Sequence, residues 1–234
     1  MNRKIICALD TGDLHEALKI VRRLSEHVGA FKVGHALTLP YGLDVISKLQ
    51  DAGAIRVFLD LKFHDIPNSV ALAVREAARQ GVWMLTLHIT GGPAMMTAAV
   101  EEARSFGDTS APLLMGVSVL TSLDQHTLTD QIGVQRTISE QMLHLSQLAI
   151  DTGLDGVICP APEVRSVRGS IGHAGIIVTP GIRMPHDDVG DQKQVGTPQQ
   201  ALTDGADYLV VGRALLSSPD IEAALESFKL PTTA

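Results

Sequence analysis

The sequence has few of the features that mark secreted or membrane-bound proteins. Its 234 residues include only two cysteines, Cys7 and Cys159, each within or at the end of a short apolar run. Two such cysteines make a disulfide framework improbable, and burial as free thiols is favoured over catalysis. No segment reaches the ~18 uninterrupted apolar residues of a membrane span, and the apolar start of the chain is too short for a secretory signal. We therefore expect a cytoplasmic protein that does not bind membranes.

Positive charge is also scarce. There are 19 Lys and Arg against 26 Asp and Glu, so the net charge is −7 and the pI is near 5.7. This balance argues against a general nucleic-acid binder, which would carry a basic surface. A small anionic ligand remains compatible, because a few arginines can form one basic pocket on an acidic protein.

Metal-binding and dinucleotide-binding motifs are missing. The nine histidines are scattered, with no His-Glu-x-x-His and no paired cysteines, and no Gly-x-Gly-x-x-Gly follows the first apolar run. Asp60, His64 and Asp65 could be imagined as metal ligands, but the ammonium of Lys62 would repel a divalent cation there. We expect neither a metal nor a cofactor.

Short apolar runs are present in a regular rhythm, each followed by a segment with helical periodicity. Because the runs are apolar on consecutive residues, they are typical of parallel strands covered on both faces. They predict strands near Lys4–Leu9, Ala30–Val33, Arg56–Leu61, Met84–His88, Leu113–Val119, Gly156–Cys159, Gly175–Val178 and Tyr208–Val211. Eight such units favour an α/β fold of the TIM type, a (β/α)8 barrel, as one domain over residues 1–234. A doubly wound open sheet is the alternative.

Local signals mark where several helices begin. Asp13 and Thr137 are each followed three residues later by a glutamate, the spacing of a capping box. Pro67 could begin a helix over Val70–Gln80 that ends with Gly81 as its C-cap.

Polar residues lie where the predicted strands end. Active sites of such barrels are at the carboxyl ends of the strands, so these residues are candidates for function. They are Asp10, Lys32, Asp60, Lys62, His88, Thr121, Ser122, Arg183, Gly212 and Arg213.

Four of these candidates are charged and could form an alternating array. Asp60 and Lys62 are two residues apart on one strand, so they project to the same side, and Asp10 and Lys32 end the two preceding strands. Unit charges ~4 Å apart interact by about 4 kcal/mol at an effective dielectric of ~20, enough to keep the lysines charged. The array would hold an ammonium proton and a negative charge beside a reacting carbon. A structural salt-bridge network is the other interpretation.

The last two predicted strands are followed by sequences suited to phosphate. Thr179-Pro180-Gly181-Ile182-Arg183 follows the seventh strand and Val211-Gly212-Arg213 the eighth. Barrels commonly bind phosphate at these loops, where glycine permits close backbone approach and arginine can make a bidentate contact. The polar stretch at 186–194 is either a surface loop or a lid over the phosphate.

The segment Phe58-Leu59-Asp60-Leu61-Lys62-Phe63-His64-Asp65-Ile66-Pro67-Asn68 closely resembles the signature of the orotidine 5'-phosphate decarboxylase family. Ala8-Leu9-Asp10, Phe31-Lys32-Val33-Gly34, Val119-Leu120-Thr121-Ser122, Gly190-Asp191-Gln192 and the two phosphate-loop sequences agree with that family in order and spacing. The resemblance covers nearly the whole chain.

The resemblance implies a role for each matching residue. Lys62 would deliver a proton to C6 of the pyrimidine as CO2 leaves, and Asp60 would lie beside the substrate carboxylate and help position Lys62. Lys32 and Asp10 would complete the array and contact the ribose hydroxyls, and Asp65 would reach the partner's site in a homodimer. The further substrate contacts implied are Ile66, Ser69, Thr121, Ser122, Arg183, Gln192, Gly212 and Arg213.

Two small departures and two rival functions remain. Ser69 stands where the family usually has threonine, and Ile89-Thr90 follows His88 where it usually has alanine and a small residue. Hexulose-phosphate synthase and ketogulonate-phosphate decarboxylase have a similar Asp-x-Lys-x-x-Asp motif but use magnesium and a sugar phosphate. Phe63-His64 and Ile66-Pro67-Asn68 fit the nucleotide enzyme better. A catalytically silent phosphate-binding barrel is the second rival.

Overall fold

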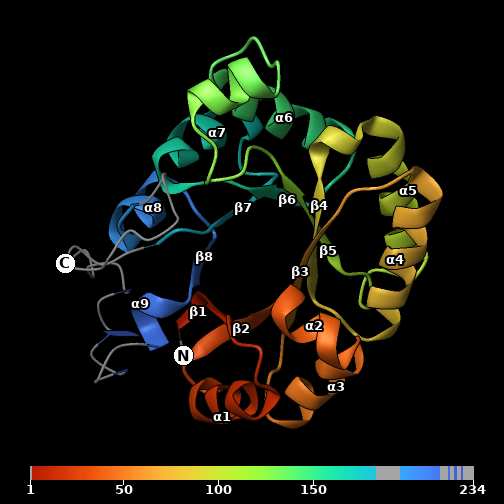
Figure 1. Cartoon of the computed structure of the whole chain (residues 1–234), viewed down its shortest axis with the longest axis vertical. Coiled ribbons are helices and arrows are strands. Elements are labelled where there is room, and N and C mark those ends of the chain that lie inside the picture. Colours follow the sequence, from red (N-terminus) through yellow and green to blue (C-terminus); the bar gives the residue numbers. More distant parts are fainter. Residues whose placement is uncertain (1, 183–195, 217–220, 222–223, 226–227, 229–234) are drawn as a thin grey trace.

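The predicted (β/α)8 barrel is confirmed. The structure is a computed structural model that describes residues 2–182, 196–216, 221, 224–225 and 228. Eight parallel strands follow one another around a closed barrel in chain order, and the helices form a ring outside them (Figure 1). The first and last strands close the barrel, with Ile6 paired to Val210.

Each predicted strand is present, with ends shifted by no more than two residues. The strands are β1 (Asn2–Ala8), β2 (Val28–Val33), β3 (Val57–Phe63), β4 (Met84–His88), β5 (Leu113–Val117), β6 (Gly156–Ile158), β7 (Ile176–Thr179) and β8 (Tyr208–Val211).

The helices that cover the barrel vary more in length than the strands do. They are α1 (Leu14–Leu24), α2 (His35–Tyr41), α3 (Asp44–Asp51), α4 (Pro67–Arg79), α5 (Pro93–Arg104), α6 (Ile138–Asp151), α7 (Val164–Ile171), α8 (Pro198–Asp204) and α9 (Arg213–Leu216). Two 3-10 turns, η1 (Ile89–Gly91) and η3 (Ala161–Glu163), and a π-helical turn, η2 (Thr127–Gln131), follow β4, β6 and β5. No helix in the described part of the chain is long and apolar enough to cross a membrane.

The predicted helix starts are mostly as expected. Thr137 and Glu140 form the complete capping box of α6, and Pro67 is the first residue of α4. Asp13 caps α1 by accepting a hydrogen bond from the backbone N–H of His15 at 2.8 Å. The other half of that predicted box is wrong, because the Glu16 carboxylate instead accepts a hydrogen bond from the Thr11 hydroxyl. The C-cap of α4 is Gln80, with Gly81 next at a φ of +70°.

Two apolar cores are separated by the wall of the barrel. Alternate residues of the strands point inward and outward, so Ile5 and Cys7 pack against the helices while Ile6 and Ala8 fill the interior. The interior cluster contains Ile6, Ala8, Ala30, Phe58, Met84, Met115, Val178 and Val210. Both strand faces are apolar, which explains the continuous apolar runs in the sequence.

Both cysteines are buried free thiols, as predicted. Burial raises the pKa of Cys7 to about 12, with a further rise caused by Asp10, while Lys32 acts in the opposite direction. Burial also raises the pKa of Cys159. Neither thiol is suited to act as a thiolate nucleophile near neutral pH.

Candidate active site

The inward-facing rows of the barrel become polar toward the carboxyl ends of the strands. Asp10 lies two residues beyond Ala8, Lys32 two beyond Ala30, and Asp60 two beyond Phe58, where each preceding residue belongs to the interior core. The same alternation carries β4 from Met84 to Thr86 and His88. The apolar interior of the barrel therefore lies beneath a layer of polar side chains at the carboxyl ends of the strands, which is where the active sites of such barrels are found.

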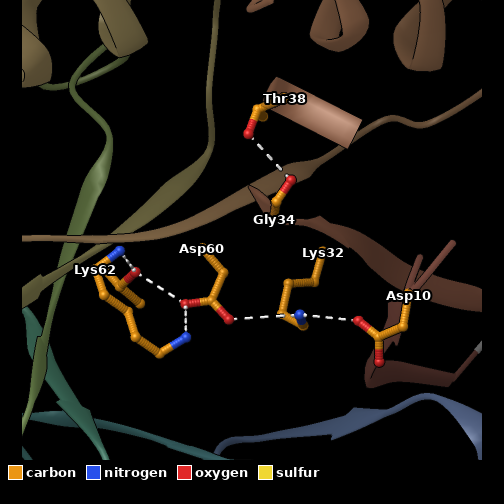
Figure 2. Close-up of polar contacts among 7 residues, drawn as sticks. Asp10, Lys32, Gly34, Thr38, Asp60 and Lys62 are labelled. Carbon is orange, nitrogen blue, oxygen red and sulfur yellow. Dashed lines mark hydrogen bonds and ion pairs between the residues drawn. The ribbon is translucent and has the colours of Figure 1, made fainter. Parts of the chain in front are cut away.

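Four charged side chains form a continuous chain of alternating sign in this layer (Figure 2). The Lys32 Nζ lies 3.3 Å from the Asp10 Oδ1 and 3.4 Å from the Asp60 Oδ2, and the Lys62 Nζ lies 2.8 Å from the Asp60 Oδ1. The side chains of Lys32 and Asp60 are only 14% and 13% exposed, whereas Asp10 is 62% exposed at the rim. The structure thus brings the predicted array together in the predicted order.

The array controls the charge state of its two central members. Burial alone would raise the pKa of Asp60, but the positive charges of Lys32 and Lys62, with hydrogen bonds from Lys62 and Thr86, outweigh it and leave the pKa below its usual value. Burial opposes the charged form of Lys32 too, yet Asp60 and Asp10 on either side raise its pKa. Both groups are therefore held in their ionised forms despite burial.

The backbone of β3 is irregular where it presents the array. The pairing of β3 with β4 steps from Leu59 opposite Leu85 to Phe63 opposite Leu87, so three residues of β3 lie opposite a single residue of β4. Lys62 lies within this bulge, and it alone among the described non-glycine residues has a positive φ, of 51°. Bulges and left-handed residues redirect side chains, and both occur often at active sites.

A cavity of about 360 Å³ opens above the array. All four charged side chains line it, and apolar residues of the barrel interior form its floor and much of its wall, among them Ala8, Phe58, Val117, Ile158 and Val210. The cavity therefore offers a charged patch next to an apolar surface, an arrangement suited to a small molecule with a flat apolar part.

Comparisons with known proteins show the family of the chain. The model of the orotidine 5'-phosphate decarboxylase / HUMPS family matches residues 3–228. The chain belongs to this family. Orotidine 5'-phosphate decarboxylase of Pseudoalteromonas translucida is 45% identical over 224 residues, which cover 96% of this chain and 94% of that protein. That of Moorella thermoacetica is 45% identical, covering 94% and 88%. The crystal structure of the Lactobacillus acidophilus enzyme matches with a TM-score of 0.85 and 35% identity over 97% of this chain and 100% of that one.

Several residues implied by the family resemblance lie at this cavity. Thr121 and Ser122, in the loop after β5, line it, as do Pro180 and Gly181 after β7 and Gly212 after β8. A Cβ atom at Gly212 would lie 3.1 Å from the Asp10 carboxylate, so Asp10 would have to shift slightly to admit a side chain there.

Three other implied residues lie apart from the cavity of their own chain. Asp65 and Ile66 are exposed after β3, where the Asp65 Oδ1 accepts a hydrogen bond from the Ile66 backbone N–H. Ser69 is half-buried in the first turn of α4. None of the three lines the cavity of its own chain.

The remaining phosphate candidates are only partly described. Arg183, Gln192 and the 186–194 stretch lie outside the described residues, and of Arg213 only the backbone at the start of α9 is described. Among the described residues, no group of three or more His, Cys, Asp or Glu side chains is arranged to hold a metal ion.

Thr86 is a site residue that the sequence analysis missed. Its hydroxyl donates a hydrogen bond to the Asp60 Oδ1 at 3.0 Å and accepts one from the Lys62 backbone N–H at 2.9 Å. The available signal was a polar residue in the apolar run Met84–His88, on the inward-facing row that ends at His88. Its partners on β3 could not be inferred without the strand register.

Proposed function

We propose that the protein is an orotidine 5'-phosphate decarboxylase, which converts orotidine 5'-phosphate to UMP in pyrimidine biosynthesis. The observation that carries the proposal is the Asp10–Lys32–Asp60–Lys62 chain at the mouth of a barrel whose family relatives bear this name. An ammonium group beside a buried carboxylate is the arrangement that protonation of a carbanion-like carbon needs.

In the reaction, the bond between C6 of the pyrimidine and the carboxylate breaks, and its electron pair stays on C6. Lys62 stabilises the developing negative charge and transfers a proton to C6 as CO2 leaves. The ring cannot delocalise negative charge at C6 well. A fixed ammonium therefore stabilises the transition state, in which that charge develops, more than the ground state. Asp60 lies beside the departing carboxylate and holds the Lys62 ammonium at 2.8 Å.

The rest of the substrate is bound along the same face. Asp10 and Lys32 contact the ribose hydroxyls, and Thr121 or Ser122 contacts the pyrimidine ring. Gly212 and Arg213, together with Gln192 and Arg183, bind the phosphate. Binding energy from the phosphate orients the reacting end, far from the bond that breaks. The reaction exchanges CO2 for a proton with no net oxidation or reduction, and we propose that it needs no metal or cofactor.

The active form is a homodimer in the cytoplasm. Asp65 lies exposed just after β3, and Ile66 and Leu72, on the same segment and on α4, are among the exposed large apolar residues. Docking this surface against a second copy would cover both apolar side chains and bring Asp65, Ile66 and Ser69 to the partner's cavity. The buried free thiols suit a reducing compartment.

The test is ultraviolet absorbance of orotidine 5'-phosphate mixed with purified protein in excess EDTA. We expect rapid conversion to the spectrum of UMP, which would establish the reaction and its independence from a divalent metal together. Activity that appears only with magnesium and sugar phosphates would assign the protein to the related barrel enzymes. Binding of the nucleotide without turnover would indicate a phosphate-binding barrel.

A further inference from the structure

Thr86 occupies the point where the bulge of β3 breaks the ladder to β4. Regular pairing ends at Leu59 opposite Leu85 and resumes at Phe63 opposite Leu87, so Asp60, Leu61 and Lys62 lie outside the ladder register. A buried backbone N–H in such a gap needs another acceptor. The Lys62 N–H finds it in the Thr86 hydroxyl, at 2.9 Å.

The same hydroxyl has a second partner in the array. Having accepted the Lys62 N–H, the Thr86 Oγ1 donates its own proton to the Asp60 Oδ1, the oxygen that also receives the Lys62 Nζ. One atom therefore ties the backbone of Lys62 to the carboxylate that binds the Lys62 side chain. Thr86 is only 1% exposed, so water does not readily substitute for it.

We propose that Thr86 is a positioning residue for decarboxylation, whose hydroxyl fixes the left-handed backbone of Lys62 and the rotamer of Asp60 so that the ammonium points at the reacting carbon. This inference rests on the proposed function. Thr86 does not line the cavity, so it acts through its two partners, Asp60 and Lys62. A hydroxyl can accept and donate a hydrogen bond at once. A methyl group in its place would leave the Lys62 N–H without an acceptor and remove one of the hydrogen bonds to the Asp60 carboxylate.

The decisive comparison is Thr86→Ser with Thr86→Ala, because these variants lack the same methyl group and differ only by the hydroxyl. We expect Thr86→Ser to keep kcat within about threefold of the wild type. We expect Thr86→Ala to lower kcat about 100-fold, the effect of misplacing a reacting group by about 1 Å. KM should change much less than kcat in either variant, because the Thr86 hydroxyl binds the Asp60 Oδ1 on the Lys62 side, whereas Lys32, which contacts the ribose, pairs with the Asp60 Oδ2.

Thr86→Val supplies a second variant without the hydroxyl, with the side-chain volume retained, in case Thr86→Ala does not fold. The matched control is Thr38→Val, which removes another buried threonine hydroxyl. The Thr38 hydroxyl donates a hydrogen bond to the carbonyl of Gly34, the N-cap of α2, and has no contact with the four charged side chains in Figure 2. Its removal should leave kcat unchanged. Thermal unfolding of each variant separates lost stability from lost turnover in the folded protein.

Equal kcat for Thr86→Ser and the folded hydroxyl-free variants, even with a lower melting temperature, would overturn the inference and leave Thr86 a structural residue. A loss confined to KM would overturn it too. A wild-type protein that does not decarboxylate orotidine 5'-phosphate would instead overturn the proposed function, and this inference with it.

Discussion

Lys62 combines a strained backbone with a side chain held in an ion pair. Its φ of 51° is costly for a residue with a Cβ, and its ammonium lies 2.8 Å from Asp60. Such strain persists only where surrounding contacts enforce it, as at sites that require one orientation of a side chain. This makes Lys62 the residue at which the proposed chemistry is most directly tested.

For Lys62→Ala we expect a folded protein that still binds UMP but has lost turnover by about a thousandfold or more, because the proton donor and the charge opposite C6 are both gone. Single-turnover kinetics and UMP titration measure the two properties separately. Substantial residual activity would refute the assignment of Lys62 as proton donor.

His88, at the end of β4, is expected to make stability depend on pH. Burial lowers the pKa of His88, His64 and Lys62 lower it further, and Asp60 acts in the opposite direction. The folded protein therefore resists protonation that the unfolded chain accepts near pH 6.5. The free energy of unfolding should fall as the pH drops below about 6.5 and level off below the folded pKa.

Urea unfolding at a series of pH values checks this expectation. His88→Gln should flatten the decline that begins below about pH 6.5, whereas His15→Gln, at an exposed position of α1, should leave the decline in place. An unchanged slope in His88→Gln would show that other groups cause the acid sensitivity.

At the scale of elements, capping was predictable because it depends on residues close in sequence. The capping box of α6 needs only Thr137 and Glu140, and both of its hydrogen bonds are present. The bulge of β3 was not predictable, because it arises from the pairing of β3 with β4. An Asp-x-Lys pattern indicates that the two side chains project from the same side of a strand. It does not indicate that the strand departs there from regular pairing with its neighbour.

Thr137→Ala should lower the free energy of unfolding by about 1 kcal/mol, because the N–H of Glu140 loses its cap and the Glu140 carboxylate loses the Thr137 hydroxyl. Thr137→Ser keeps the cap and serves as the control. Chemical denaturation of the three proteins gives the comparison; equal stability of the alanine and serine variants would mean that the cap contributes little to α6.

At the scale of the whole molecule, the proposed dimer would make each site depend on two chains. Asp65 is exposed and does not line the cavity of its own chain, while Lys62 does. If Asp65 serves the partner's site, each site contains Lys62 from one chain and Asp65 from the other. A substitution of Lys62 then damages the site of its own chain, and a substitution of Asp65 damages the site of the partner.

Mixing the inactive Lys62→Ala and Asp65→Ala variants should therefore restore part of the activity once subunits exchange and mixed dimers form. Random mixing gives heterodimers in about half of the molecules, each with one intact site, so activity should reach about a quarter of the wild type. Each variant alone is the control, and sedimentation checks that dimers form. Mixed dimers that stay as inactive as the separate variants would place Asp65 in its own chain's site or outside the site.

The sequence by itself determined the barrel, the order of its strands, most helix starts and the charged candidates Asp10, Lys32, Asp60 and Lys62. These follow from apolar periodicity and from hydrogen bonds between near neighbours, both of which can be read along the chain. Only the tertiary structure decided the 3.3 and 3.4 Å contacts of Lys32, the left-handed turn at Lys62 and the part of Thr86. Those features depend on the register between strands distant in sequence, and closing the barrel sets that register through the packing of its interior.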